Sequence, residues 1–169
     1  ATPYQLLGFA MNKAFDEYLL KFDIAYKHNL QQNRTGQFIK LDRIDWDLAF
    51  DIQKNDRQWL FSINSQYLLD YAHDYLTPTL LGSVSAKRNN MNYMVSVSDK
   101  FGDSDWKWGL SNVIASNNDL SLSSATLDWD INDQWQASFS GTYIDAKDNR
   151  AFAILDDYQR VNLEVQYQY

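Results

Sequence analysis

Residues 160–169 read RVNLEVQYQY, and this stretch decides the fold class because its polarity alternates without a break. Polar side chains fill every second position. A period of two residues indicates a β-strand with one apolar and one polar face, because successive side chains point to opposite sides of the backbone. The sequence therefore predicts a terminal strand whose apolar positions are Val161, Leu163, Val165, Tyr167 and Tyr169.

The same alternation recurs along the rest of the 169 residues. It is clear in YLLKFDIAYK (residues 18–27), RIDWDLAFDI (43–52) and QWQASFSGTYI (134–144). Short polar stretches of the turn-forming kind, such as KNDR and SNND, separate these runs. About ten antiparallel strands in meander order follow from this pattern. No linker divides the chain, so we expect residues 1–169 to form one β-barrel domain or the C-terminal portion of one.

Three irregularities refine this expectation. Residues 29–37 and about 146–158 read as long polar connections. Leu120 and Leu122 are out of phase with Leu127, which predicts a bulge or turn near Ser123 to Ala125. If the turn at residues 15–17 is periplasmic, the first strand enters from outside. A complete barrel starts in the periplasm, so in that case the chain would be the C-terminal part of a larger barrel.

Composition excludes several classes of protein. The formal net charge is −7, which argues against nucleic acid and anionic headgroups as main partners. There is no cysteine, so neither a disulfide nor a thiolate metal site can form. The chain has no run of 18 apolar residues, so no membrane helix is predicted, and no signal peptide is recognisable. Either a signal precedes Ala1, or residue 1 lies inside a longer gene product.

A sheet of strands with alternating polarity can close into two main kinds of barrel. A lipocalin-like carrier turns its apolar face inward around a ligand, whereas an outer-membrane barrel turns that face to lipid and keeps a polar lumen. Charges of both signs occupy the polar positions, and we expect them to line a lumen: Lys21, Asp23, Lys27, Arg43, Asp45, Asp47, Asp51, Asp128, Asp130, Arg160 and Glu164. An excess of acids in an open lumen favours cations over anions.

Tryptophans on the apolar positions favour the membrane solution. Most lie near predicted strand ends, where an interfacial aromatic girdle is found, because indole has an apolar body and one polar N–H. The alternative is ordinary core tryptophans of a β-sandwich. The predicted girdle is Trp46, Trp59, Trp106, Trp108, Trp129 and Trp135.

Residues 161–169 resemble the β-signal of bacterial outer-membrane proteins, in which alternating apolar residues and a terminal aromatic are read by the barrel-assembly machinery. Phenylalanine is commoner than tyrosine in the last place, so Tyr169 departs slightly from the pattern. The resemblance implies the Gram-negative outer membrane as location, with its lipid and lipopolysaccharide and the assembly machinery as partners.

A looser resemblance covers most of the chain. The stretches LLGFAMNKAFDEYLLKFDIAYK, LDRIDWDLAFDIQ and LDDYQRVNLEVQYQY look like the C-terminal half of a family of large proteobacterial outer-membrane proteins associated with RND-type exporters. The resemblance implies a longer chain, export or uptake of hydrophobic compounds, and another barrel segment or an export-complex subunit as partner.

Other motifs favour ordinary structural roles. Asp45, Asp47 and Asp51 are expected to be lumen charges neutralised by nearby lysine and arginine. DKFGDSD (residues 99–105) lacks the EF-hand spacing and reads as a hairpin turn. His28 and His73 have no recognisable catalytic partner, and no hydrolase or phosphate-binding motif is present. A short cluster at residues 87–90 reads as a turn. We therefore predict no enzyme activity, no cofactor and no metal, and a porin-like or transport function.

Overall fold

The computed structural model describes residues 4–34, 37–72, 75–79, 82–85, 87–102, 104–115, 120–146 and 156–167. Within these ranges the protein is all-β, as the sequence predicts. No helix among the described residues is long and apolar enough to cross a membrane.

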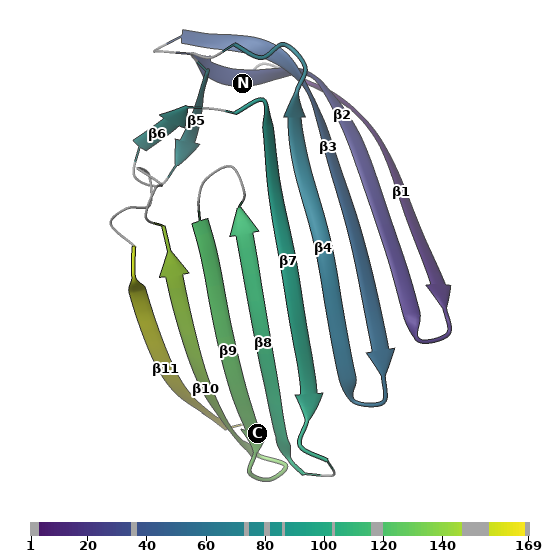
Figure 1. Ribbon diagram of the computed structural model, residues 1–169, viewed down its shortest axis with the longest axis vertical. Helices are drawn as coiled ribbons and strands as arrows, with labels where there is room; N and C mark the ends of the chain where they lie inside the picture. Colours follow the sequence, from purple (N-terminus) through teal and green to yellow (C-terminus); the bar gives the residue numbers. More distant parts are fainter. Residues whose placement is uncertain are drawn as a thin grey trace.

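Eleven strands are described, against the ten or so predicted. In chain order they are β1 (Gln5–Phe15), β2 (Tyr18–Arg34), β3 (Gln37–Lys54), β4 (Arg57–Leu68), β5 (Tyr75–Thr79), β6 (Gly82–Ser85), β7 (Asn89–Lys100), β8 (Trp106–Ala115), β9 (Leu120–Asp130), β10 (Trp135–Asp145) and β11 (Tyr158–Tyr167). Nine of them form one antiparallel sheet in the order β1-β2-β3-β4-β7-β8-β9-β10-β11 (Figure 1).

The short strands β5 and β6 interrupt the predicted meander. They pair with each other as a hairpin between β4 and β7 in the chain. The hairpin does not pair with either of those strands. Instead β5 pairs antiparallel with the end of β2, at Asn33 and Arg34, beyond the last residue of β2 that pairs with β1.

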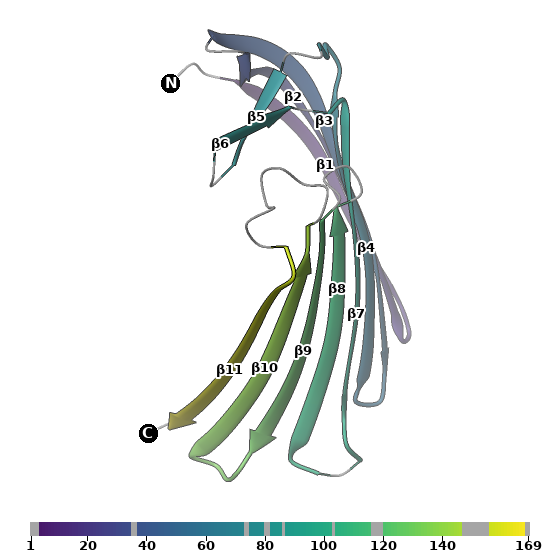
Figure 2. The same cartoon turned by 60° about the vertical axis from the view of Figure 1, so that its left-hand side comes forward.

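The described sheet is curved but open (Figures 1 and 2). β1 pairs only with β2, and β11 only with β10, within the described part of the chain. The antiparallel all-β prediction is therefore confirmed, whereas these strands by themselves do not close into the predicted barrel. Each edge strand leaves one row of backbone donors and acceptors without a neighbouring strand.

One end of the sheet carries tight connections, and we call it the turn end (the lower end in Figure 1). Two-residue turns join β1 to β2 and β3 to β4 there. Asp16 and Asn55 adopt positive φ angles of 46° and 55° in these turns. Aspartate and asparagine tolerate this conformation better than other residues with a Cβ, so the turn chemistry fits the local sequence.

The prediction of a long loop at residues 29–37 is wrong. Strands β2 and β3 continue through this segment, and Arg34 pairs with Gln37. The two strands are 17 and 18 residues long and extend beyond their neighbours. A β-bulge at His28 and Asn29, which together oppose Asp42, interrupts their register. Asn29 has a φ of 60°, typical of a bulge residue. The bulge breaks the alternation, which is why the segment resembles a loop.

The predicted bulge or turn at residues 123–125 is also wrong. β9 pairs with β8 and with β10 without a register shift over this segment. Leu122 therefore lies on the polar face, opposite Val113 on β8 and Ile144 on β10. On these three strands the polar face becomes apolar away from the turn end. The apolar residues therefore switch from one face to the other because their surroundings change, and the backbone stays regular.

A small apolar cluster lies on the polar face, at the end away from the turns. Leu41 and Leu68 are buried there. They pack against Leu30, Ile39, Tyr71 and Ala72, and the last two lead from β4 toward the β5–β6 hairpin. Figure 2 shows that hairpin on the concave side of the sheet. The polar face is therefore the concave face, and the apolar face is the convex one.

Candidate functional site

All of the predicted lumen residues lie on the concave face. The strand registers place them together, because cross-strand partners share a face. Asp128 and Asp130 come from β9, and Arg160 and Glu164 from β11. The other charges come from two neighbouring strands, β2 and β3: Lys21, Asp23, Lys27, Arg43, Asp45, Asp47 and Asp51. Whether this face lines a lumen stays a prediction.

Two basic side chains hold one acid on the concave face. The Nζ atom of Lys27 lies 2.5 Å from a carboxylate oxygen of Asp45, and the Nε atom of Arg43 lies 2.7 Å from the other oxygen. All three side chains are at most 22% exposed. The short distances within this ion-pair cluster show that the three side chains pack against one another.

Asp23 and Asp47 face each other directly across β2 and β3. Like charges in this position repel each other, so the pair destabilises the sheet unless a cation lies nearby. Beside them a hollow of about 410 Å³ extends over the concave face of β1, where Gly8 and Ala10 have very small side chains. Asp45 also lines this hollow.

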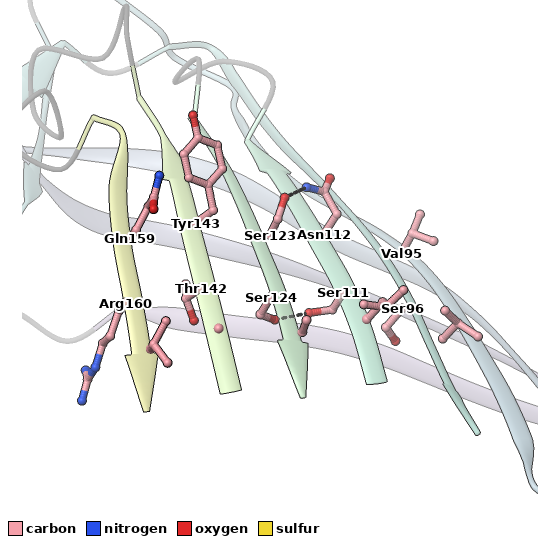
Figure 3. A pocket seen from close by; sticks show the side chains of 15 residues that line it. Val95, Ser96, Ser111, Asn112, Ser123, Ser124, Thr142, Tyr143, Gln159 and Arg160 are labelled. Carbon is pink, nitrogen blue, oxygen red and sulfur yellow. Dashed lines mark hydrogen bonds between the residues drawn. The ribbon is translucent and has the colours of Figure 1, made fainter. Parts of the chain in front are cut away.

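The middle of the concave face is neutral, which the sequence analysis missed. Asn92 on β7 donates a hydrogen bond to Asn64 on β4, over 2.7 Å. The hydroxyls of Ser111 on β8 and Ser124 on β9 are 2.6 Å apart (Figure 3). Hydroxyl and amide side chains at alternate positions of β4, β7 and β8 were the available signal. This face therefore combines charged sectors with a neutral hydrogen-bonding sector.

The convex face is apolar and uncovered. Many large hydrophobic side chains on it remain 36–75% exposed. Buried hydrophobic residues are correspondingly few among the described positions: Leu41, Leu68, Ala115 and Ala146. A sheet of this size in a soluble domain normally buries one face against another layer. Most of the apolar surface of this chain is thus available for contact with something outside the described residues.

Aromatic residues form a belt on the convex face near the turn end. Trp106 and Trp129 stack with ring centroids 4.9 Å apart, and Trp135 and Tyr167 lie 4.8 Å apart. The belt follows the edge of the sheet across most of its strands and consists of Tyr18, Trp59, Trp106, Trp129, Trp135 and Tyr167. The remaining predicted girdle residues, Trp46 and Trp108, lie on the same face.

A second belt lies at a constant spacing along the strands. It begins eight residues beyond the first belt on β2, β4 and β10 and consists of Tyr26, Tyr67 and Tyr143. Eight residues of β-strand span about 26 Å. The side chains midway between the belts are aliphatic or phenylalanine, among them Phe22, Leu48, Ile63, Leu110, Phe139 and Leu163.

The convex face becomes polar at both margins of this band. Arg57, next to the first belt, donates a 2.7 Å hydrogen bond to Asp99. Near the second belt Ser65 donates to Asn89 over 2.6 Å. Along the strands the convex face is thus charged at one margin, then aromatic, then apolar, and it carries aromatic and polar side chains together at the other margin. An apolar layer that meets water on both sides fits this arrangement, because tyrosine and tryptophan favour the boundary between an apolar phase and water.

The residues of the predicted assembly signal occupy the convex face of β11. Val161, Leu163, Val165 and Tyr167 are opposite Gly141, Phe139, Ala137 and Trp135 of β10. Tyr169 lies outside the described residues. The alternation of the opening sequence is therefore a strand pattern in the structure, and its recognition by an assembly machinery stays a prediction.

A shallow hollow of about 700 Å³ interrupts the apolar band on strands β7 to β11 (Figure 3). It forms where Ala125 and Gly141 are opposite each other, because both side chains are small. A Cβ placed on Gly141 would meet no atom within 4 Å. Val95, Val97, Leu110 and Val161 line the hollow together with the polar residues Asn112, Ser123 and Gln159.

A polar cluster holds the bulge between β2 and β3. The carboxylate of Asp42 accepts a hydrogen bond from the hydroxyl of Tyr26 and one from the backbone N–H of Asn29, over 3.1 Å. The Nδ1 atom of His28 lies 2.8 Å from the same carboxylate. The hydrogen bonds from Tyr26, Asn29 and His28 lower the pKa of Asp42. A carboxylate that accepts a bulge N–H stabilises the irregular backbone there.

The remaining motifs of the sequence concern metal binding and turns. The described residues contain no group of three acidic, histidine or cysteine side chains arranged to hold a metal ion. Gly102 has a φ of 58° in the turn between β7 and β8, as expected of a glycine turn. Asp103 and His73 lie outside the described residues. Residues 87 and 88 precede β7 and are exposed, whereas Asn89 and Asn90, which were also predicted to lie in this turn, are the first two residues of β7.

Comparisons with protein-family models, with curated proteins and with solved structures find no match to this chain.

Proposed function

We propose that this chain forms part of the wall of a bacterial outer-membrane β-barrel, with its convex face in lipid and its concave face toward a polar lumen through which solutes pass. The observation that carries the proposal is the uncovered apolar band between two aromatic belts. No chemistry is required of the residues on the concave face for this function.

The dimensions of the band support the proposal. The spacing between belts is about 26 Å along a strand, which becomes about 20 Å across the membrane at a typical tilt of about 40°. Outer-membrane barrels have an apolar band about 25 Å tall between aromatic girdles. The charged pair of Arg57 and Asp99 beyond the first belt would then lie among the lipid headgroups.

The distribution of polarity favours a membrane barrel over the lipocalin-like alternative. A lipocalin-like carrier needs apolar side chains on its concave side, around the ligand. Here the concave side has the ion pairs of Lys27 and Arg43 with Asp45, and most of the large exposed apolar side chains point the other way. A water-soluble form of this sheet would expose the whole apolar band to solvent.

The test uses two neighbouring positions on β4, Phe61 and Ser62, whose side chains point to opposite faces. The chain has no cysteine, so Phe61→Cys and Ser62→Cys each provide one labelling site. Both variants are labelled with a polarity-sensitive fluorophore and folded with phospholipid vesicles. Lipids brominated on the acyl chain should quench the probe at Phe61 strongly and the probe at Ser62 weakly, and aqueous iodide should show the reverse order.

Equal quenching at the two positions, or no effect of brominated lipid on either, would overturn the membrane proposal. The solute path is measured separately as conductance in a planar bilayer under a salt gradient. Because acids outnumber bases on the concave face, we expect the reversal potential to show a preference for cations.

The family resemblance and the partners stay proposals of the same kind. We propose lipopolysaccharide and outer-membrane lipid as the surroundings of the convex face, and the barrel-assembly machinery as the reader of β11. Membership of a large proteobacterial outer-membrane family associated with RND-type exporters rests on the three quoted stretches alone.

A further inference from the structure

The two open edges of the sheet run in the same direction. β1 runs toward the turn end, because Gln5 pairs with His28 and Phe15 adjoins the first two-residue turn. β11 also runs toward the turn end, because Tyr167 lies opposite Trp135 at the start of β10. This follows from the count of strands, since the first and ninth strands of an antiparallel sheet point the same way.

The shared direction restricts how the sheet can close. Direct pairing of β1 with β11 would be parallel, unlike every pairing in the described sheet. A second copy with the same orientation in the membrane would also bring β11 beside β1 in parallel. An inverted copy would place the turn end and the β5–β6 hairpin on the wrong sides of the bilayer. Antiparallel closure needs an odd number of strands between the edges.

We propose that an odd number of further transmembrane strands closes this sheet, joining β1 at one edge and β11 at the other, and that a second copy of this chain does not. This rests on the proposed function, because open strand edges are very costly in lipid. The resulting barrel has an even number of strands, as single-chain bacterial outer-membrane barrels do.

The side chains at the edges fit such strands. On the convex face Leu7 of β1 and Leu163 of β11 are 75% and 74% exposed, among the highest values for hydrophobic residues. An added strand with alternating polarity would cover part of each side chain and continue the apolar band. On the concave face of β1, Gly8 and Ala10 leave room beside Asp23 for larger polar side chains of a neighbouring strand.

The experiment extends the full chain after Tyr169 with one, two or three strands copied from its own sequence. One added strand consists of the turn at residues 131–134 followed by a copy of β10; two and three continue with copies of β11 and then β10. Each protein is folded in detergent. Closure is read as faster migration of the unheated band on a gel and as hydrogen-exchange protection of the amides of β1.

We expect the one-strand and three-strand proteins to show both signs of closure, and the unextended and two-strand proteins to show neither. A matched control has the added residues in shuffled order, without alternation, and should behave as the unextended chain. Closure of the unextended or two-strand protein, or closure that does not follow odd and even strand number, would overturn the inference.

The Phe61→Cys label, introduced into each of these extended proteins and read in vesicles, separates this result from the proposed function. Odd–even closure without quenching by brominated lipid would refute the membrane proposal and leave the rule for closure standing. Quenching by brominated lipid without odd–even closure would refute the closure rule alone.

Discussion

Replacing Phe139 by arginine is expected to destabilise the protein in a bilayer by about 2–4 kcal/mol. Phe139 lies on the convex face of β10, four residues from Trp135 and four from Tyr143. Each belt is therefore about 13 Å away along the strand. An arginine side chain is too short to bring its charge fully to either boundary, so the guanidinium would lie near the middle of the apolar band.

The matched control is Ser140→Arg, one residue further along the same strand. Ser140 points to the concave face, opposite Asn162 of β11 and Thr126 of β9. An arginine there would face a polar environment, so we expect a change within about 0.5 kcal/mol, as for most surface substitutions. The two variants add the same charge and differ only in the face on which it lies.

The assay is urea unfolding of the chain in phospholipid vesicles, followed by tryptophan fluorescence. A loss of 2–4 kcal/mol corresponds to a decrease of about 30-fold to about 700-fold in the folding equilibrium constant, because about 1.4 kcal/mol is a factor of ten. If Phe139→Arg and Ser140→Arg lose equal stability, the convex face is not in lipid and the reasoning from the belts fails.

Two glycines on strands should respond in opposite ways to alanine. A Cβ on Gly109 would lie 2.8 Å from the hydroxyl oxygen of Thr126, so Gly109→Ala should cost about 1–3 kcal/mol in the same unfolding assay. The Cβ of Gly141→Ala would lie in open space, so this variant should stabilise the folded state by about 0.4–1 kcal/mol, because alanine reduces the conformational freedom of the unfolded chain. Equal effects of the two substitutions would contradict this difference in packing around the two glycines. The lowered pKa of Asp42 means that its contribution is present above the pKa of the unfolded chain, near 3.8, and is lost as pH falls through the lower folded value. Unfolding of Asp42→Asn should therefore depend less on pH below about 4 than that of the natural chain, and an unchanged acid limb would refute this.

Alternating polarity predicted the strands and their faces because each residue in a strand points to one side or the other. For this reason the faces on which the six tryptophans and the concave charges lie could be predicted from the local sequence alone. Their cross-strand neighbours could not be predicted in this way. That Lys27 and Arg43 share Asp45 depends on the register of β2 against β3, which two strands of similar pattern do not determine by themselves.

The bulge shows where alternation gives the wrong prediction. Beyond His28 and Asn29 the phase of β2 shifts by one residue, so that Leu30 lies on the same face as Lys27. A reading by period alone therefore ends the strand at the bulge. The hydrogen bonds that Asp42 accepts there come from Tyr26 and the Asn29 backbone, and the local sequence does not predict them.

Closure could not be predicted from the strands because it depends on the edges, and edges have no distinctive side-chain pattern. β1 and β11 alternate like the inner strands, which is expected if both are inner strands of a complete barrel. A natural sheet edge in water usually has charges or proline on its exposed strand to prevent pairing. β1 has one charged residue, Lys13, and its convex positions include Phe9 and Met11. The absence of edge protection on β1 therefore supports a neighbouring strand there, and the strand directions require that the number of added strands is odd.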